Sequence, residues 1–447
     1  MTGLSQPMSP PAARPIAPPV MLARAALWAA VGFHLLVVEV MFALYGTGKN
    51  GILTAAKFFG LHAALLMMLQ LTLIARIPWL DRRIGMDRLT AWHRWIGFSL
   101  LWTVVLHGSF VVLGYSALDD AAPWTTFFAL AAVPAGLLGI CAAAIIVGIA
   151  SVSFRFLRRR LSYEVWHGIH MCVYLALLLG MVHQFLEGTT FSSPVATLYW
   201  WALWALVLGA LVGGRVILPL WRNHYHQFRV AAVVPESDDV VSVHVTGRHL
   251  DRLPARAGQF MIWRFPGHNR WWQANPFSLS AAPNGRSLRL TAKAVGSTSA
   301  GLRHLPVGTR VFAEGPYGAF TSIHQTKPAR LLIAGGVGIT PVRSLLEESY
   351  VPTVVLYRVP DLRDAVLLAE LEALARERNA LLRVLPGRTG PGNAPFEPQG
   401  LYALVPDIQH RDVYVCGPPR MTEAVVKSLK ALGVPGIQIH AERFALA

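Results

Sequence analysis

Six long apolar runs occupy the first half of this 447-residue chain and limit what it can fold into. They cover approximately residues 25–45, 53–75, 92–115, 124–150, 165–186 and 195–220. Each run is close to the ~20 residues that a helix needs to cross the hydrocarbon core of a bilayer. Only 14% of the residues are charged, whereas soluble domains have roughly 25%. The sequence therefore predicts a multi-pass membrane protein and excludes an ordinary soluble enzyme.

The loops between these runs alternate in charge, which predicts the orientation of the chain. One set of loops, together with the flanks of the first and last runs, carries the positive charge: Arg14, Arg24, Arg76, Arg82, Arg83, Arg88, Arg155, Arg158, Arg159, Arg160, Arg215 and Arg222. The opposite loops hold Asp119, Asp120 and Glu187, with Lys49 as a mild exception. Because positive loops stay in the cytoplasm, we expect both termini to be cytoplasmic, in the cell (inner) membrane. The alternative, a helical bundle buried in a soluble protein, does not explain this alternation, and the same clustering at membrane loops disfavours nucleic-acid binding in spite of a net charge of +16.

Two further blocks follow the apolar half. Short alternating strands separated by turn residues begin near Phe228, and from about Pro328 strands alternate with helices. The first pattern predicts an antiparallel β-barrel or sandwich, and the second a doubly wound parallel α/β domain. We therefore expect a disordered leader over residues 1–24, a six-helix transmembrane bundle over 25–222, a β-domain over 223–326 and an α/β domain over 327–447.

Three cysteines, Cys141, Cys172 and Cys416, lie far apart and form no C-x-x-C pair. This spacing excludes a disulfide framework, a structural zinc site and a cysteine-ligated iron–sulfur cluster.

Four histidines form two matched pairs inside the apolar runs. His93 and His107 are 14 residues apart on the third predicted helix, and His170 and His183 are 13 apart on the fifth. Each pair is therefore separated by about 20 Å along its helix, and two such helices can clamp two stacked haems, each iron taking one histidine from each helix. On a regular helix, a spacing of 14 residues leaves the two side chains of a pair within about 40° of the same direction, whereas a spacing of 13 residues leaves them about 140° apart. The fifth helix thus needs either an irregularity, which Gly180 would permit, or ligands that approach their haems from different sides.

Other ionisable residues near the membrane have simpler explanations. We expect His34 and His62, which stand alone on their helices, to bond to a backbone carbonyl or a helix neighbour. His167 competes with His170 as a ligand, although the spacing to His183 favours His170. Arg94 and the arginines at 158–160 could pair with haem propionates, or could be ordinary topology charges.

The α/β block contains a glycine-rich turn. Gly335, Gly336 and Gly338 lie where a predicted strand becomes a helix, in RLLIAGGVGITP. Glycines there let the backbone approach a pyrophosphate at the N-terminus of the helix, so the turn favours a dinucleotide site. Cys416 and Gly417 end another buried strand on the same carboxyl edge, where Cys416 could also be a simple buried apolar residue. In the β-block, Ser278 and Ser280 are expected on one face of a strand.

With these motifs, the chain resembles the family of ferric reductases and NADPH oxidases. The segment YEVWHGIH, followed by His183, is similar to the fifth helix of that family, and the His93/His107 pair is similar to its third. The resemblance implies that His93, His107, His170 and His183 ligate two b-type haems. It also implies an FAD site. That site takes in Asn275, Pro276, Phe277 and Ser278, in a motif where the family has histidine in place of Asn275, together with Gly296, Ser297 and Thr298.

The resemblance extends to the nucleotide end of the chain. The segment Glu314, Gly315, Pro316, Tyr317, Gly318 is similar to the motif that closes the flavin barrel. Gly335, Gly336, Gly338 and Thr340 match the nicotinamide dinucleotide motif, while Cys416 and Gly417 match the segment near the nicotinamide ring. Phe444 is the expected residue stacking on the flavin.

The family implies electron transfer from cytosolic NAD(P)H through FAD and two haems to an acceptor across the membrane. That small acceptor is ferric iron or dioxygen, giving ferrous iron or superoxide, and no motif decides between them. NADPH is slightly preferred because Arg358 or Arg388 could pair with a 2′-phosphate, although both could be surface arginines. The alternative is a non-catalytic membrane protein that binds or senses nucleotides, and the intact GGVGITP and CGPP segments argue against it.

Overall fold

The computed structural model describes residues 19–154, 158, 160, 161, 163–187, 193–268, 273, 275–348, 350–390 and 392–443. They form two compact units. The first, here the helical unit, comprises Arg24–Leu80 and Asp87–Leu218. The second, here the sheet unit, contains Asp81–Met86 and Pro219–Leu446.

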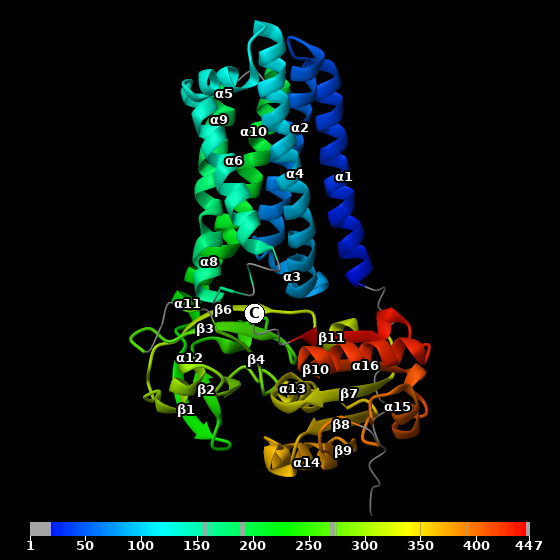
Figure 1. The fold of residues 1–447 in the computed structure, drawn as a ribbon. Coiled ribbons are helices and arrows are strands. Elements are labelled where there is room, and N and C mark those ends of the chain that lie inside the picture. Colours follow the sequence, from blue (N-terminus) through cyan, green and yellow to red (C-terminus); the bar gives the residue numbers. More distant parts are fainter. Residues whose placement is uncertain are drawn as a thin grey trace, which may run out of the picture. The chain divides into compact units, whose positions relative to one another are not determined.

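The apolar half of the chain forms helices, which Figure 1 shows in blue to green. Their bounds are α1 (Pro19–Tyr45), α2 (Gly51–Ile74), α3 (Pro78–Ile84), α4 (Met86–Asp119), α5 (Pro123–Ala131), α6 (Pro134–Ser153), α8 (Tyr163–Met171), α9 (Val173–Glu187), α10 (Pro194–Val212) and α11 (Leu218–His226), with a π-helical turn at Gly213–Ile217. Within the described residues, six helical stretches are long and apolar enough to cross a membrane. The prediction of six apolar helices is therefore confirmed.

Two of the predicted helices are interrupted. The fourth run, expected as one helix over 124–150, divides into α5 and α6 because Pro134 forces the preceding Val133 into extended backbone (φ −88°, ψ 129°). The fifth is broken at Cys172, whose N–H donates to the Ile169 carbonyl three residues back at 3.1 Å. This tighter turn is an irregularity between His170 and His183, and it lies at Cys172 rather than at Gly180.

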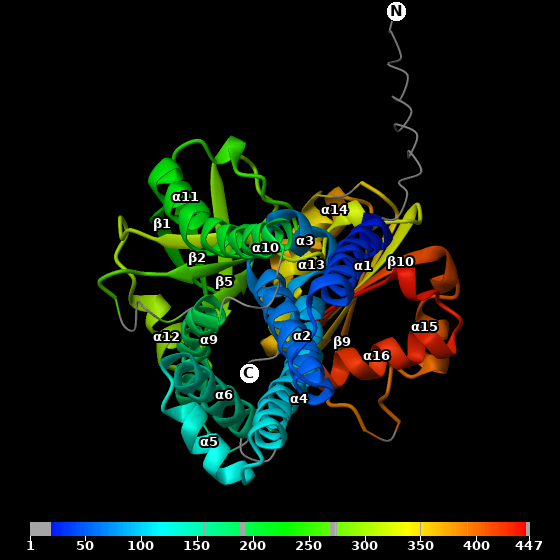
Figure 2. The same cartoon turned by 90° about the horizontal axis from the view of Figure 1, so that it is seen from above.

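Inside the helical unit, α6 lies along α9 and α10 packs against α2 (Figures 1 and 2). Its buried core includes Trp200 and Trp204 of α10 and Leu61 and Met68 of α2. Large apolar side chains are exposed on the outside, such as Phe185, which is 70% exposed. Apolar residues on both the inside and the outside are expected of helices surrounded by lipid.

The β-block consists of two three-stranded antiparallel sheets, ordered β1-β2-β5 and β4-β3-β6. The strands are β1 (Arg229–Pro235), β2 (Val240–Thr246), β3 (Phe260–Arg264), β4 (Asn275–Ser278), β5 (Ser287–Lys293) and β6 (Phe312–Tyr317). Inward-facing apolar residues such as Val243, Trp263 and Leu290 share one core. The antiparallel prediction is confirmed, with single bridges at Arg229–Arg310 and Leu279–Leu290 outside the strands.

The α/β block is a five-stranded parallel sheet ordered β11-β10-β7-β8-β9, shown in yellow to red in Figure 1. Its strands are β7 (Ala329–Gly335), β8 (Thr353–Val359), β9 (Leu381–Pro386), β10 (Arg411–Gly417) and β11 (Ile439–Arg443). Helices α13 (Ile339–Glu348) and α14 (Leu368–Glu377) share a core with one face of the sheet. Helices α15 (Pro398–Leu404) and α16 (Pro419–Ala431) share a core with the other face. The parallel prediction is confirmed, while the domain boundaries at 24/25, 222/223 and 326/327 stay predictions.

Candidate functional site

The four paired histidines of the sequence meet at two levels, between α4 on one side and α8 and α9 on the other. The ring centroids of His93 and His170 are 6.1 Å apart, with the ring planes at 71°. Those of His107 and His183 are 6.4 Å apart, at 68°. Helix α4 supplies one histidine to each pair, and α8 and α9 supply the others. The arrangement is two imidazole pairs stacked along the bundle.

The second pair is oriented by backbone carbonyls. Nδ1 of His107 donates to the Ala56 carbonyl at 2.8 Å, and Nδ1 of His183 donates to the Ala135 carbonyl at 2.7 Å. A carbonyl can only accept, so the proton is on Nδ1 and the lone pair is on Nε2 in both rings. A metal-ligating histidine is held in the same way, with its other nitrogen donating to a carbonyl.

Glycines on neighbouring helices make room for these two rings. A Cβ on Gly60 of α2 would lie 2.8 Å from the His107 ring, and a Cβ on Gly139 of α6 would lie 2.9 Å from Nδ1 of His183. Both positions therefore exclude a side chain, and the rings lie directly against the helix backbones.

The first pair lacks such bonds at its buried Nδ1 atoms. Neither Nδ1 of His93 nor Nδ1 of His170 has a partner among the described residues. By contrast, the two lone histidines are satisfied by protein groups: His34 contacts the Tyr199 hydroxyl at 2.6 Å, and His62 contacts the Phe58 carbonyl and the Glu39 carboxylate, both at 2.8 Å. His167 is not one of the paired rings.

These observations fit iron held between two imidazoles. With about 2 Å from a metal to each imidazole nitrogen and about 1.1 Å from that nitrogen to the ring centroid, two ligands on opposite sides of a metal would have centroids about 6.2 Å apart. The separations of 6.1 and 6.4 Å agree with that value. The donor set, the spacing of both pairs and the tautomers of His107 and His183 thus fit a haem iron at each level.

The predicted flavin motif lies at strand β4. Ser278 ends the strand, and its buried Oγ has no partner among the described residues. Asn275 begins the strand, and its amide donates to the carbonyls of Trp263 (3.3 Å) and Gln273 (2.9 Å). Asn275, which stands where the family has histidine, therefore holds the strand to neighbouring backbone carbonyls. Pro276 and Phe277 lie between Asn275 and Ser278.

The second predicted flavin segment starts a short helix, α12 (Ser297–Gly301), with Gly296 as its N-cap. The Gly296 N–H donates to Oγ of Ser299 at 3.1 Å. Ser297 and Thr298 are the first two residues of this helix. The expected stacking residue, Phe444, lies outside the described residues.

The glycine-rich turn lies between β7 and α13, as predicted. A Cβ on Gly338 would lie 2.3 Å from the Cys416 carbonyl, and a Cβ on Gly335 would lie 2.6 Å from Sδ of Met421. Gly336 has a positive φ of 53°. The turn therefore packs directly on the end of β10, where Gly417 follows Cys416, and Thr340 Oγ1 donates to the Val337 carbonyl at 3.0 Å.

Cys416 is fully buried at the end of β10. Burial raises the pKa of its thiol, and the neighbouring Glu442 raises it further. The thiol is therefore protonated at neutral pH and is a poor nucleophile.

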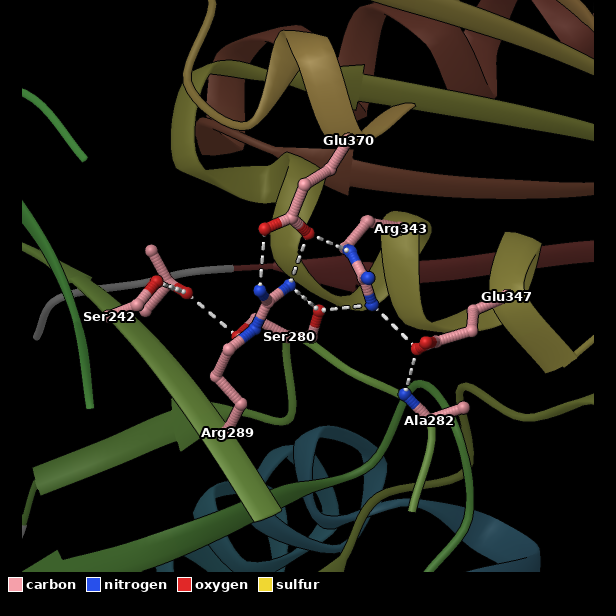
Figure 3. A network of polar contacts seen from close by, with 8 residues as sticks. Ser242, Ser280, Ala282, Arg289, Arg343, Glu347 and Glu370 are labelled. Atoms are coloured by element: carbon pink, nitrogen blue, oxygen red, sulfur yellow. Dashed lines mark hydrogen bonds and ion pairs between the residues drawn. The ribbon is translucent and has the colours of Figure 1, made fainter. Parts of the chain in front are cut away.

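A polar network joins the β-block to the α/β block, as Figure 3 shows. Arg289 of β5 forms two bonds to Glu370 of α14, at 2.9 and 3.0 Å. Arg343 of α13 also donates to Glu370, at 2.8 Å, and to Glu347 at 2.5 Å. Both guanidiniums donate to the Ser280 carbonyl. No sequence motif pointed to these residues; only Ser280 was singled out, and it lies just beyond β4.

A segment between α2 and α4 belongs to the sheet unit. Oδ2 of Asp81 accepts from the Gly318 N–H at 2.9 Å, and the Arg82 carbonyl contacts Nε2 of His324 at 3.0 Å. Gly318 has a positive φ of 99° and ends the predicted barrel-closing motif. Asp81 is 2% exposed, so this bond is shielded from water.

Arg358, one candidate for a 2′-phosphate, has another role. Its guanidinium donates to the carbonyls of Leu385 and Pro386 and to Asn393. Arg388 is exposed.

Comparison with known proteins identifies each part of this arrangement. Residues 59–181 match the ferric reductase like transmembrane component, 225–321 an FAD-binding domain, and 332–427 an oxidoreductase NAD-binding domain. A flavohemoprotein of Xylella fastidiosa is 25% identical over 66% of this chain and 79% of its own length. The ferredoxin reductase component of 3-ketosteroid-9-alpha-monooxygenase from Mycobacterium tuberculosis is 32% identical over 50% of this chain and 66% of its own length.

A solved structure is similar to part of the chain. The flavohem-like FAD/NAD binding domain of nitric oxide dioxygenase from Vibrio cholerae is 26% identical, covers 49% of this chain and 98% of that chain, and gives a TM-score of 0.41. The combination of matches defines a multi-pass membrane flavoprotein oxidoreductase. Together the three matches support a ferric reductase/NADPH oxidase-like family.

Proposed function

We propose that this oxidoreductase transfers electrons from cytosolic NAD(P)H, through FAD and two b-type haems, to ferric iron or dioxygen across the membrane. The observation that carries the proposal is the pairing of His93 with His170 and of His107 with His183 at centroid separations of 6.1 and 6.4 Å. Arginine-rich loops on one side of the helices support cytoplasmic termini in the cell membrane.

The chemistry that the cofactors supply when bound is hydride acceptance and single-electron release at the flavin, and one-electron relay at the haems. The protein supplies position and environment. In this proposal, Nε2 of His107 and Nε2 of His183 would hold one and the same iron, and the carbonyls of Ala56 and Ala135 fix the planes of the two rings. These second partners also increase the basicity of the ligand nitrogen.

At the nucleotide end, the residues hold and orient rather than react. Helix α13 starts directly after Gly336 and Gly338, and the N-terminus of a helix favours a pyrophosphate. The unpaired Ser278 hydroxyl is available to the flavin. Because the Cys416 thiol is buried and protonated, we assign it a packing role near the nicotinamide rather than a redox role.

Absorption spectra of the purified full-length chain test this proposal. We expect a b-type haem spectrum with two haems per chain that NADPH or NADH reduces. His107→Ala and His183→Ala should each remove about one haem per chain. His34→Ala is the matched control, because His34 is also a membrane histidine but bonds to Tyr199.

The spectra can also contradict the proposal. Haem content that is unchanged in both variants would refute the ligand assignment. Normal haem content with no reduction by either nucleotide would refute the electron route. Parallel assays with ferric chelate and with superoxide detection would then separate the two acceptors.

A further inference from the structure

A small basic pocket lies where the last membrane helix joins the first β-strand. It has a volume of about 200 Å³ and is lined by His224, Gln227, Phe228, Arg229 and Arg310. Phe228 is buried and the three basic side chains are exposed. None of the motifs attributed to haem, flavin or nucleotide binding includes these residues.

The chain geometry brings the three basic residues together. Helix α11 ends at His226, and Gln227 then adopts a left-handed conformation (φ 49°) that turns the chain into β1. His224 and Arg229, on either side of this turn, therefore line the same pocket. Arg310 joins them because it forms a β-bridge with Arg229.

The Arg229–Arg310 pair places two positive charges directly opposite each other. Like charges at such cross-strand positions are destabilising. Within the described part of the chain, neither arginine forms an ion pair with a carboxylate; Arg229 donates to the Gly308 carbonyl at 3.0 Å. A bound anion would relieve this repulsion, and a phosphate offers acceptors to both guanidiniums.

The position of the pocket along the helix indicates where the phosphate comes from. His224 lies in the last turn of the candidate span Pro194–His226, three residues or about 4.5 Å beyond Trp221. Trp221 is 56% exposed and stacks on Tyr225, with centroids 5.3 Å apart. Exposed aromatic residues at the end of a span lie at the level of the lipid headgroups.

We propose that this pocket binds the phosphate group of an anionic lipid, between Arg229 and Arg310 and beside His224. Basic pockets next to the cytoplasmic ends of membrane helices recognise such headgroups. The volume is below the ~300 Å³ of sites for drug-sized ligands, so it suits a headgroup phosphate and excludes a dinucleotide.

Thermal unfolding of the full-length chain in neutral detergent tests the site. Phosphatidylglycerol, phosphatidylcholine and inorganic phosphate are titrated separately, with phosphatidylcholine as the zwitterionic lipid control. The double variant Arg229→Gln/Arg310→Gln is compared with Arg376→Gln/Arg383→Gln, which removes two exposed arginines from α14 and β9. Native mass spectrometry counts the bound lipids in the same samples.

We expect phosphatidylglycerol to raise the Tm of the wild type and of the control variant. The Arg229/Arg310 variant should need about tenfold more lipid for the same shift, and should retain fewer lipids. Equal responses of the two double variants would overturn the site. If inorganic phosphate alone raised the Tm as much as phosphatidylglycerol does, and did so only when Arg229 and Arg310 are present, the phosphate bound in the pocket would not come from a lipid.

Discussion

Arg289 and Glu370 form a two-bond ion pair, at 2.9 and 3.0 Å, that joins strand β5 of the flavin-binding block to helix α14 of the nucleotide-binding block. Arg343 donates to the same carboxylate. The side chains of Arg289 and Arg343 are only 7% and 9% exposed. Glu370 therefore bridges two buried guanidiniums at the junction of the two blocks.

Replacing Glu370 by Gln should loosen this junction. The variant leaves two buried positive charges without their shared partner, which should cost about 2 kcal/mol of local stability, or roughly 30-fold faster amide exchange in α14 and β5. Hydrogen exchange of the full-length chain measures this effect. Glu372→Gln, on the exposed side of the same helix, should leave exchange unchanged. Equal exchange in the two variants would show that the ion pair does not hold the junction.

The same carboxylate predicts a pH dependence. Partial burial favours the neutral form of Glu370, but Arg289 and Arg343 outweigh this effect, and the pKa is lowered. The stabilisation is therefore complete above the ordinary glutamate pKa of ~4.3 and is lost as the pH falls through the lower pKa of the folded state. The protection of the α14 amides, measured relative to the intrinsic exchange rate at each pH, should fall on acidification below about pH 4.3 in the wild type. In the Glu370→Gln variant this acid step should be absent, and its persistence there would assign it to another group.

Gly139→Ala should impair one haem site. The new Cβ would lie 2.9 Å from Nδ1 and 3.0 Å from Cε1 of His183, so the ring must move away from the Ala135 carbonyl. Loss of such an orienting bond costs about 10–100-fold in metal affinity. Haem content per chain should fall toward one, as measured by the pyridine haemochrome spectrum. Gly148→Ala on the same helix has no atom within 4 Å of its Cβ and should keep both haems. Full haem content in Gly139→Ala would contradict the role of Gly139.

Much of this arrangement was predictable because patterns within short stretches of the sequence specify it. Apolar length gave the six helices, alternation gave the antiparallel strands, and the glycine turn gave the start of α13. The 13-residue spacing of His170 and His183 pointed to an irregularity in the fifth helix. It did not indicate that Cys172 would be the residue at which the helix is broken. The sequence also could not separate α5 from α6 by hydropathy alone, although Pro134 was the available signal.

The residues that sequence reasoning missed act through contacts between distant segments. Arg289 and Glu370 are 81 residues apart, and Asp81 and Gly318 are 237 apart. In neither pair does the spacing along the sequence indicate that the two residues meet. Their partners become evident only when the sheets and helices are assembled.

Arg388 should decide the preference between NADPH and NADH, because the Arg358 guanidinium is already hydrogen-bonded to other groups of the protein. The Arg358 guanidinium donates to backbone carbonyls and to Asn393, whereas Arg388 is exposed just beyond β9, next to the strand that carries Arg358. If Arg388 pairs with the 2′-phosphate, Arg388→Ala should raise the KM for NADPH about tenfold and change the KM for NADH less than about twofold. Steady-state kinetics with both nucleotides measure this difference. Arg383→Ala, which removes an exposed arginine within β9, should leave both values unchanged, and an equal effect of Arg388→Ala on the two nucleotides would exclude the 2′-phosphate contact.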